Sequence, residues 1–135
     1  MEWLLVTAAG ITLFSLLEAW LATLIIYWRV TFLKRIFPAT QNLIHSHIDY
    51  LIMTGLLGVV YFSCLVLGLK LPDPIIVVLC IGAIYNPFGF VIKAINPKAG
   101  MGGDLKEILV VSIGFIPATI GFGYAMIAIL LELFN

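Results

Sequence analysis

Charged side chains are scarce in this chain. Asp, Glu, Lys and Arg make up 10% of the 135 residues, whereas about 25% is typical of a soluble domain. Hydrophobic residues make up 63%, and the mean hydropathy is +1.19. The net charge is zero, so no basic surface is available for nucleic acid. The composition excludes a soluble globular domain and predicts an integral membrane protein in contact with the lipid bilayer.

Cysteine is also scarce, since the chain has only Cys64 and Cys80. Both lie inside apolar runs and no CxxC motif is present, which excludes a disulfide framework or a cysteine metal site. We therefore interpret both as small buried hydrophobic residues. The N-terminal run MEWLLVTAAG lacks the basic region that begins a cleavable signal peptide, so we expect a membrane span there.

Four long apolar runs account for most of the sequence, and a transmembrane helix needs about 20 apolar residues. They predict an all-α bundle of four transmembrane helices in a single domain, residues 1–135, with spans at about 3–28, 42–69, 74–92 and 107–134. Asn86-Pro87 interrupts the third run. The fourth run carries small residues at helical spacing, which predicts a surface for close helix packing: Gly114, Ala118, Gly121, Ala125 and Ala128.

Positive charges predict the orientation in the membrane. Six of the seven basic residues fall in the first and third connections, and only Lys70 falls in the second. Because cytoplasmic loops carry the excess of Lys and Arg, we expect these two connections in the cytoplasm and both termini outside it, in an inner or cytoplasmic membrane. The six residues are Arg29, Lys34, Arg35, Lys93, Lys98 and Lys106.

Two histidines lie where the second apolar run begins, in NLIHSHIDYLIMTGLLG. Helical spacing places His47 on one face with Thr54, Gly55 and Gly58, whereas His45 points to nearly the opposite side. One helix therefore cannot present both imidazoles to a single metal ion. Neutral imidazole is a common metal ligand, and the glycines would let a flat group approach the His47 face. Binding of water or lipid phosphate by both histidines is the alternative.

Polar residues on three predicted helices fall at similar depth. Glu18, His47 and Asn86 lie about 10–15 Å from the cytoplasmic boundary at 1.5 Å per residue. Pro87 also leaves the carbonyl group of Ala83 without its usual donor. Ionisable residues in membrane spans usually face a cavity or the bundle interior, so this layer predicts a polar pocket. Polar contacts that serve helix association alone are the alternative.

Two blocks resemble the styrene oxide isomerases, a family of small four-helix membrane proteins. Ser46-His47, followed by Thr54-Gly55, is similar to the Ala-His and Asn-Gly of the family's second helix. The segment GAIYNPFGFVIKAINPKAGMGGDL, residues 82–105, is similar to the family's third-helix block and the loop after it. The matched blocks cover about a third of the chain. The resemblance implies a haem b cofactor and a homo-oligomer, in this family a trimer.

The resemblance implies that His47 is the axial ligand of the haem iron, and we expect Gly55 and Gly58 to border the haem. Asn86 matches a third-helix Asn of the family and is a candidate catalytic residue. Two positions differ. The family's second-helix Asn is replaced by Thr54, or by Met53 in an ungapped alignment, and the family's third-helix Tyr falls at Phe90 or Val91, neither of which can donate a hydrogen bond. Tyr85 and Tyr50 are the nearest candidates to replace that tyrosine, and we add Thr54 and Tyr85 as hydrogen-bond donors available to a substrate.

The family's reaction implies a small apolar epoxide as substrate and a carbonyl compound as product. Ferric haem acts there as a Lewis acid, and a 1,2-hydride shift gives the aldehyde without net electron transfer. Two other functions stay open. A non-catalytic haem protein for gas or redox sensing or electron transfer would close the second axial position with His45 or another protomer. A cofactor-free assembly or transport subunit would use the polar layer only for packing. Supporting roles for Glu18 and Asp49 are not defined by the sequence.

Overall fold

The computed structural model describes residues 1–100 and 105–134, apart from the side chains of residues 106 and 107. Residues 101–104, which belong to the segment 82–105 that resembles the family, lie outside this part. So does the side chain of Lys106, one of the six basic residues that predict the orientation in the membrane. The described chain forms five α-helices and no strand. They are α1 (Glu2–Ile26), α2 (Thr31–Ile36), α3 (Thr40–Leu67), α4 (Asp73–Ile95) and α5 (Leu105–Leu133). All but α2 are long and apolar enough to cross a membrane. This confirms the predicted all-α membrane fold.

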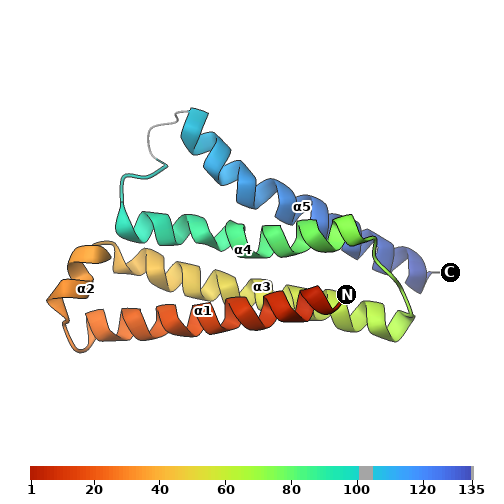
Figure 1. Cartoon of the computed structure of the whole chain (residues 1–135), viewed down its shortest axis with the longest axis horizontal. Coiled ribbons are helices and arrows are strands. Elements are labelled where there is room, and N and C mark those ends of the chain that lie inside the picture. Colours follow the sequence, from red (N-terminus) through yellow and green to blue (C-terminus); the bar gives the residue numbers. More distant parts are fainter. Residues whose placement is uncertain (101–104, 135) are drawn as a thin grey trace.

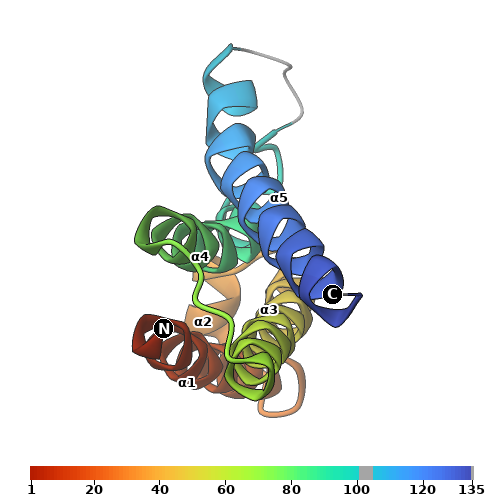
Figure 2. The same cartoon turned by 90° about the vertical axis from the view of Figure 1, so that its right-hand side faces the viewer.

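The long helices run nearly along one axis (Figure 1). α1 and α3 lie side by side, α4 packs against both, and α5 crosses α4 at an angle. Figure 2 shows α1 and α5 on opposite sides of the bundle, with α3 and α4 between them. Each long helix buries one stripe at helical spacing and exposes apolar residues elsewhere. Such exposure suits lipid contact, because a bilayer is as apolar as these side chains.

Local sequence explains where α3 ends and α4 begins. Gly68 ends α3 in the left-handed conformation with a φ of 66°, which costs glycine little. The amide of Leu69 then bonds to the carbonyl oxygen of Cys64 at 2.9 Å. Pro72 precedes α4, and Pro74 lies in its first turn, where a missing N–H has no consequence. The short connection keeps α3 and α4 antiparallel neighbours.

The helix α2 is the element that the sequence did not reveal, because its six residues looked like a basic turn. Arg29 adopts a positive φ of 51° before it, so the chain turns sharply at the end of α1. The Lys34 ammonium group then bonds to the Pro38 carbonyl at 2.9 Å and to the Thr40 hydroxyl at 3.0 Å. These bonds tie α2 to the start of α3.

The helix α4 continues through Pro87 to Ile95, although the sequence suggested an interruption there. The small residues of α5 form a packing surface, as the spacing predicted, and the helix that occupies it is α4 of the same chain. Gly114 lies against the backbone of Asn86, and Gly121 lies against Leu79. Of the two cysteines, Cys64 is buried, Cys80 is half-buried and both are free thiols.

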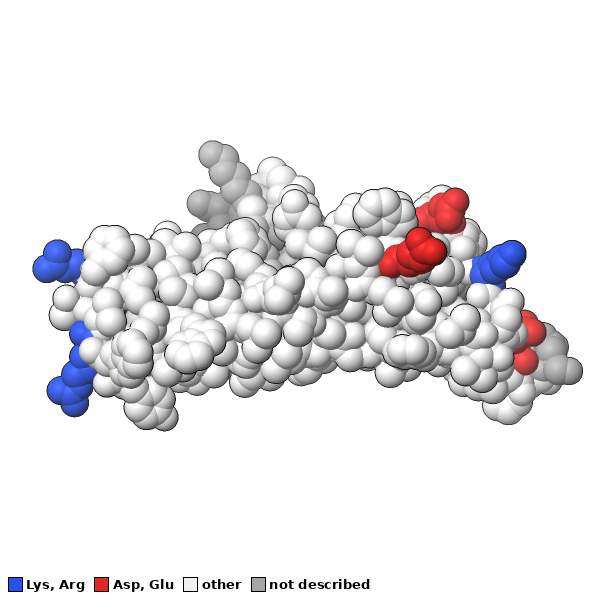
Figure 3. All heavy atoms as spheres, turned by 60° about the horizontal axis from the view of Figure 1, so that its bottom comes forward, with Lys and Arg blue, Asp and Glu red and all other residues white. Residues whose placement is uncertain are grey.

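The charges separate along the long axis. Figure 3 shows Lys and Arg side chains at one end, and Asp, Glu and a Lys at the other. The cationic end comprises the α1–α2 connection, α2 and the end of α4, with Arg29, Lys34, Arg35, Lys93 and Lys98. The interior between these ends holds the polar residues that define the candidate site.

Candidate functional site

His47 on α3 is fixed to α1 by the side chain and backbone of Ser15. Its Nδ1 lies 2.9 Å from the Ser15 carbonyl oxygen and 2.7 Å from the Ser15 hydroxyl oxygen. The same hydroxyl donates to the carbonyl oxygen of His47 at 3.1 Å. Ser15 is fully buried, so this contact anchors the imidazole inside the α1–α3 interface.

The contact also assigns the tautomer of His47. A carbonyl oxygen can only accept a hydrogen bond, so the close approach of Nδ1 to the Ser15 carbonyl requires an Nδ1–H donor. The Ser15 proton is used on the His47 carbonyl, which leaves its oxygen free to accept as well. In the neutral imidazole this assignment places the proton on Nδ1 and the lone pair on Nε2. Among the described residues no hydrogen bond involves Nε2.

The rest of the His47 face combines one polar contact with open space. The Thr54 hydroxyl donates to the Tyr50 carbonyl at 2.9 Å and lies 3.0 Å from the Thr12 hydroxyl of α1. A Cβ added at Gly55 or Gly58 would meet nothing within 4 Å. The backbone of α3 is therefore open to a close approach at Gly55 and Gly58.

A second polar cluster surrounds Glu18 of α1. Its side chain is 1% exposed, and neither carboxyl oxygen has a partner of good geometry among the described residues. The Ser46 hydroxyl lies beside it but donates to the Pro87 carbonyl at 3.4 Å, a long bond. Tyr50, also near the carboxyl group, donates to the Ile84 carbonyl at 3.0 Å. The Tyr50 proton is thus used on α4, and the Ser46 hydroxyl lies within reach of both the Glu18 carboxyl group and the Pro87 carbonyl.

We expect Glu18→Gln to stabilise the protein by about 1–3 kcal/mol, the usual cost of a buried polar group without a partner. The amide supplies two N–H donors where the neighbouring oxygens can accept. Reversible denaturation of the purified protein in mixed detergent micelles would measure the change. Glu132→Gln, at an exposed position on α5, is the matched control and should change the stability by less than about 0.5 kcal/mol. Destabilisation by Glu18→Gln would show that the carboxylate has a partner of its own.

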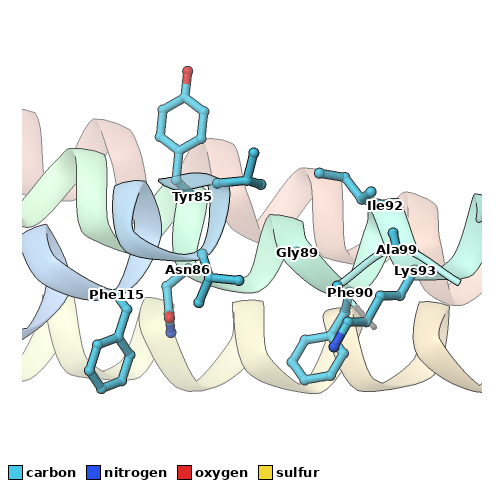
Figure 4. A pocket seen from close by; sticks show the side chains of 11 residues that line it. Tyr85, Asn86, Gly89, Phe90, Ile92, Lys93, Ala99 and Phe115 are labelled. Carbon is cyan, nitrogen blue, oxygen red and sulfur yellow. The ribbon is translucent and has the colours of Figure 1, made fainter. Parts of the chain in front are cut away.

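Asn86 and Tyr85 border a groove between α4 and α5. The groove has a volume of about 390 Å³, and its walls are mainly apolar. Figure 4 shows Asn86 and Phe115 on one side of α4, with Tyr85 pointing the opposite way. Tyr85 is 49% exposed. Neither Asn86 nor Tyr85 makes a side-chain hydrogen bond with residues 1–100 or 105–134, so both can donate to a ligand.

His45 takes no part in the His47 environment. Its ring lies 5.7 Å from that of Phe90 on α4, and its Nε2 is 3.2 Å from the Gln41 amide nitrogen. The two imidazoles therefore face different helices, as the offset of two residues predicted. Within one chain His45 does not approach the free Nε2 of His47.

The predicted polar layer divides into three environments rather than one pocket. His47 and Thr54 face α1, Glu18 is enclosed between α1, α3 and α4, and Asn86 faces α5. Because α1 and α5 lie on opposite sides of the bundle (Figure 2), His47 and Asn86 occupy different sides of it. The sequence analysis missed Ser15, and it did not assign Ser46 and Tyr50 a part in joining helices; the side chains of all three connect these helices. Small hydroxyl residues in apolar helices are too common to single out from spacing.

No known protein family, curated protein or solved structure matches this chain. The composition and the four long apolar helices place the protein in the class of integral membrane proteins with four spans.

Proposed function

We propose that the protein binds haem b through His47 and isomerises a small apolar epoxide to a carbonyl compound. The supporting observation is the bond from Nδ1–H of His47 to the Ser15 carbonyl oxygen at 2.9 Å. Histidines that ligate a metal usually donate their other ring N–H to a carbonyl or carboxylate oxygen, which fixes the ring and its tautomer. His47 has this arrangement and an Nε2 lone pair left for an iron ion.

The residues around His47 suit haem better than a bare metal ion. No group of three or more His, Cys, Asp or Glu side chains gathers as a metal site in the described part of the chain. A porphyrin supplies four nitrogen ligands itself and needs only one axial ligand from the protein. The open space at Gly55 and Gly58 allows a flat macrocycle to approach α3. His47 is thus the proposed ligand, with the two glycines beside the ring.

Held by His47, ferric haem would supply a Lewis acid for the epoxide oxygen. The protein's own residues would orient the substrate and keep water away from it. Asn86 and Tyr85 carry uncommitted donors for the substrate oxygen, whereas the Thr54 proton is used on Tyr50, so Thr54 orients by accepting a bond. The apolar surroundings exclude the water that would open the epoxide to a diol.

The proposal includes a homo-oligomer, a trimer by resemblance to the styrene oxide isomerases. Within one chain Asn86 faces α5 rather than α1, so it would reach a substrate at His47 from a neighbouring copy. We also propose that the cationic end of the bundle lies in the cytoplasm, with both termini on the other side, since five described basic residues gather there.

Epoxide turnover tests the proposed chemistry. The wild-type protein loaded with ferric haem should convert styrene oxide to its aldehyde in detergent, measured by gas chromatography against free haemin. Asn86→Ala should lower kcat about 100-fold, the usual effect of losing one donor to a developing oxyanion. Asn96→Ala, at an exposed position beyond α4, is the matched control and should retain full activity. A haem-loaded wild type that yields only diol or unreacted epoxide would contradict the isomerase proposal.

A carrier of electrons is less well supported by the geometry. Such proteins favour two axial ligands, and His45 faces Phe90 of α4 instead of the His47 side. The structure offers no second imidazole from the same chain.

A further inference from the structure

The groove between α4 and α5 opens because α5 diverges from α4 towards its N-terminal end (Figure 1). The two helices touch closely where Gly114 and Gly121 meet α4 and separate beyond Gly114. The groove left between them has about 390 Å³, within the size range of small-ligand sites. Its walls are formed mainly by Phe90, Val110, Val111 and Phe115. The last three are more than half exposed, so this apolar trough faces the membrane.

The floor of the groove is shaped by Gly89. A Cβ there would meet nothing within 4 Å, so the absent side chain leaves usable space. An occupant of the trough therefore touches the helix surface itself. A flexible hydrocarbon chain fits such a surface by dispersion contacts and requires no directional bond.

Two polar side chains lie at different positions along the groove. Lys93 stands at its outer end, in the last turn of α4, and its stem lies close to Gly100. Within the described residues its ammonium group has no ion pair. Asn86 lies two turns deeper, about 10 Å by the helical rise. Figure 4 shows Asn86, Phe90 and the Lys93 ammonium group directed to the same side of α4.

We propose that this groove binds one acyl chain of an anionic phospholipid, with the phosphate group on Lys93. The order of the groups along the groove matches the order along the lipid. The phosphate would lie at the ammonium group, the ester carbonyls on the side towards the Asn86 amide, and the chain against Phe90 and Phe115. Charge favours an anionic headgroup, because Lys93 lies in the last turn of α4, at the cationic end of the bundle. This site shares Asn86 with the proposed function, but its test measures lipid retention and needs no haem.

Lipid retention tests the site. Wild-type protein should be purified in a mild detergent with added phosphatidylglycerol or phosphatidylcholine, and the retained lipid counted by native mass spectrometry. We expect phosphatidylglycerol to be retained in preference to phosphatidylcholine. One lysine near an anionic surface contributes about 1 kcal/mol, so Lys93→Gln should weaken phosphatidylglycerol binding about fivefold. Lys70→Gln, at the opposite end of the bundle, is the matched control and should leave it unchanged.

A second variant tests binding of the acyl chain separately from binding of the headgroup. Gly89→Leu places a side chain in space that is open in the wild type, so it should fold and exclude lipid of either headgroup. Circular dichroism verifies the fold of each variant. If the wild type retains both lipids equally and Lys93→Gln changes nothing, lipid fills the groove without recognition and the proposal is wrong. Retention of phosphatidylglycerol by folded Gly89→Leu would equally contradict it.

Discussion

Gly82→Ala is expected to lower the free energy of unfolding by about 2 kcal/mol. The position is buried where α4 crosses α5, and an added Cβ would collide with the backbone nitrogen and Cα of Ala118 and lie 2.9 Å from the carbonyl carbon of Pro117. Backbone atoms of a packed helix cannot rotate away as a long side chain can. Overpacking of this kind costs about 1–3 kcal/mol, sometimes more. This outweighs the gain of about 0.5–1 kcal/mol from replacing glycine by alanine in a helix.

Two glycines provide matched controls for this expectation. Gly89 lies on the same helix and Gly123 on α5, and neither would place a Cβ within 4 Å of another atom. Gly89→Ala and Gly123→Ala should therefore keep or raise the stability through helix propensity. Denaturation of all three variants in the same micelles would compare them. A Gly82→Ala protein as stable as the two controls would show that α5 does not pack on α4 at this crossing.

The close crossing of α4 and α5 determines where the groove between them ends. Because α5 touches α4 backbone to backbone near Gly82 and Gly114, the two helices can diverge from there and leave the groove open beyond. The small residues thus define the inner end of the groove. Displacement of α5 by Gly82→Ala should accordingly alter lipid retention as well as stability.

Composition and spacing were sufficient to predict much of the fold. Long apolar runs predicted the four membrane-spanning helices, because a bilayer admits few other backbone conformations. The spacing of Gly114, Ala118 and Gly121 predicted a packing surface, which α4 occupies. The six-residue α2 was missed, since so short a segment has too few residues to show a helical period.

The site was harder to predict than the fold. Position along a helix gives the depth of a residue, so Glu18, His47 and Asn86 were placed in one layer. It does not give the rotation of each helix about its axis, which is set by packing against the others. That rotation places His47 against Ser15 and directs Asn86 to α5. The neighbours of Glu18 could not be predicted for the same reason, because Ser46 and Tyr50 come close to it only after three helices assemble.

His47→Ala is expected to abolish haem binding if the proposed function is correct. Alanine removes the Nε2 lone pair, whose availability depends on the Nδ1–H bond to Ser15. His45→Ala is the matched control, since this histidine lies two residues away on the same helix and faces Phe90. A general loss of helix stability would affect both variants, whereas loss of an axial ligand would affect only the first.

The decisive measurement is the absorption spectrum of detergent-purified protein from haem-replete cells, before and after addition of haemin. We expect a Soret band in the wild type and in His45→Ala, and none above that of free haemin in folded His47→Ala. A wild type that is colourless as purified and stays spectrally unchanged by haemin would contradict the account. The protein would then be a cofactor-free four-helix membrane bundle whose Ser15–His47 contact only joins α1 to α3.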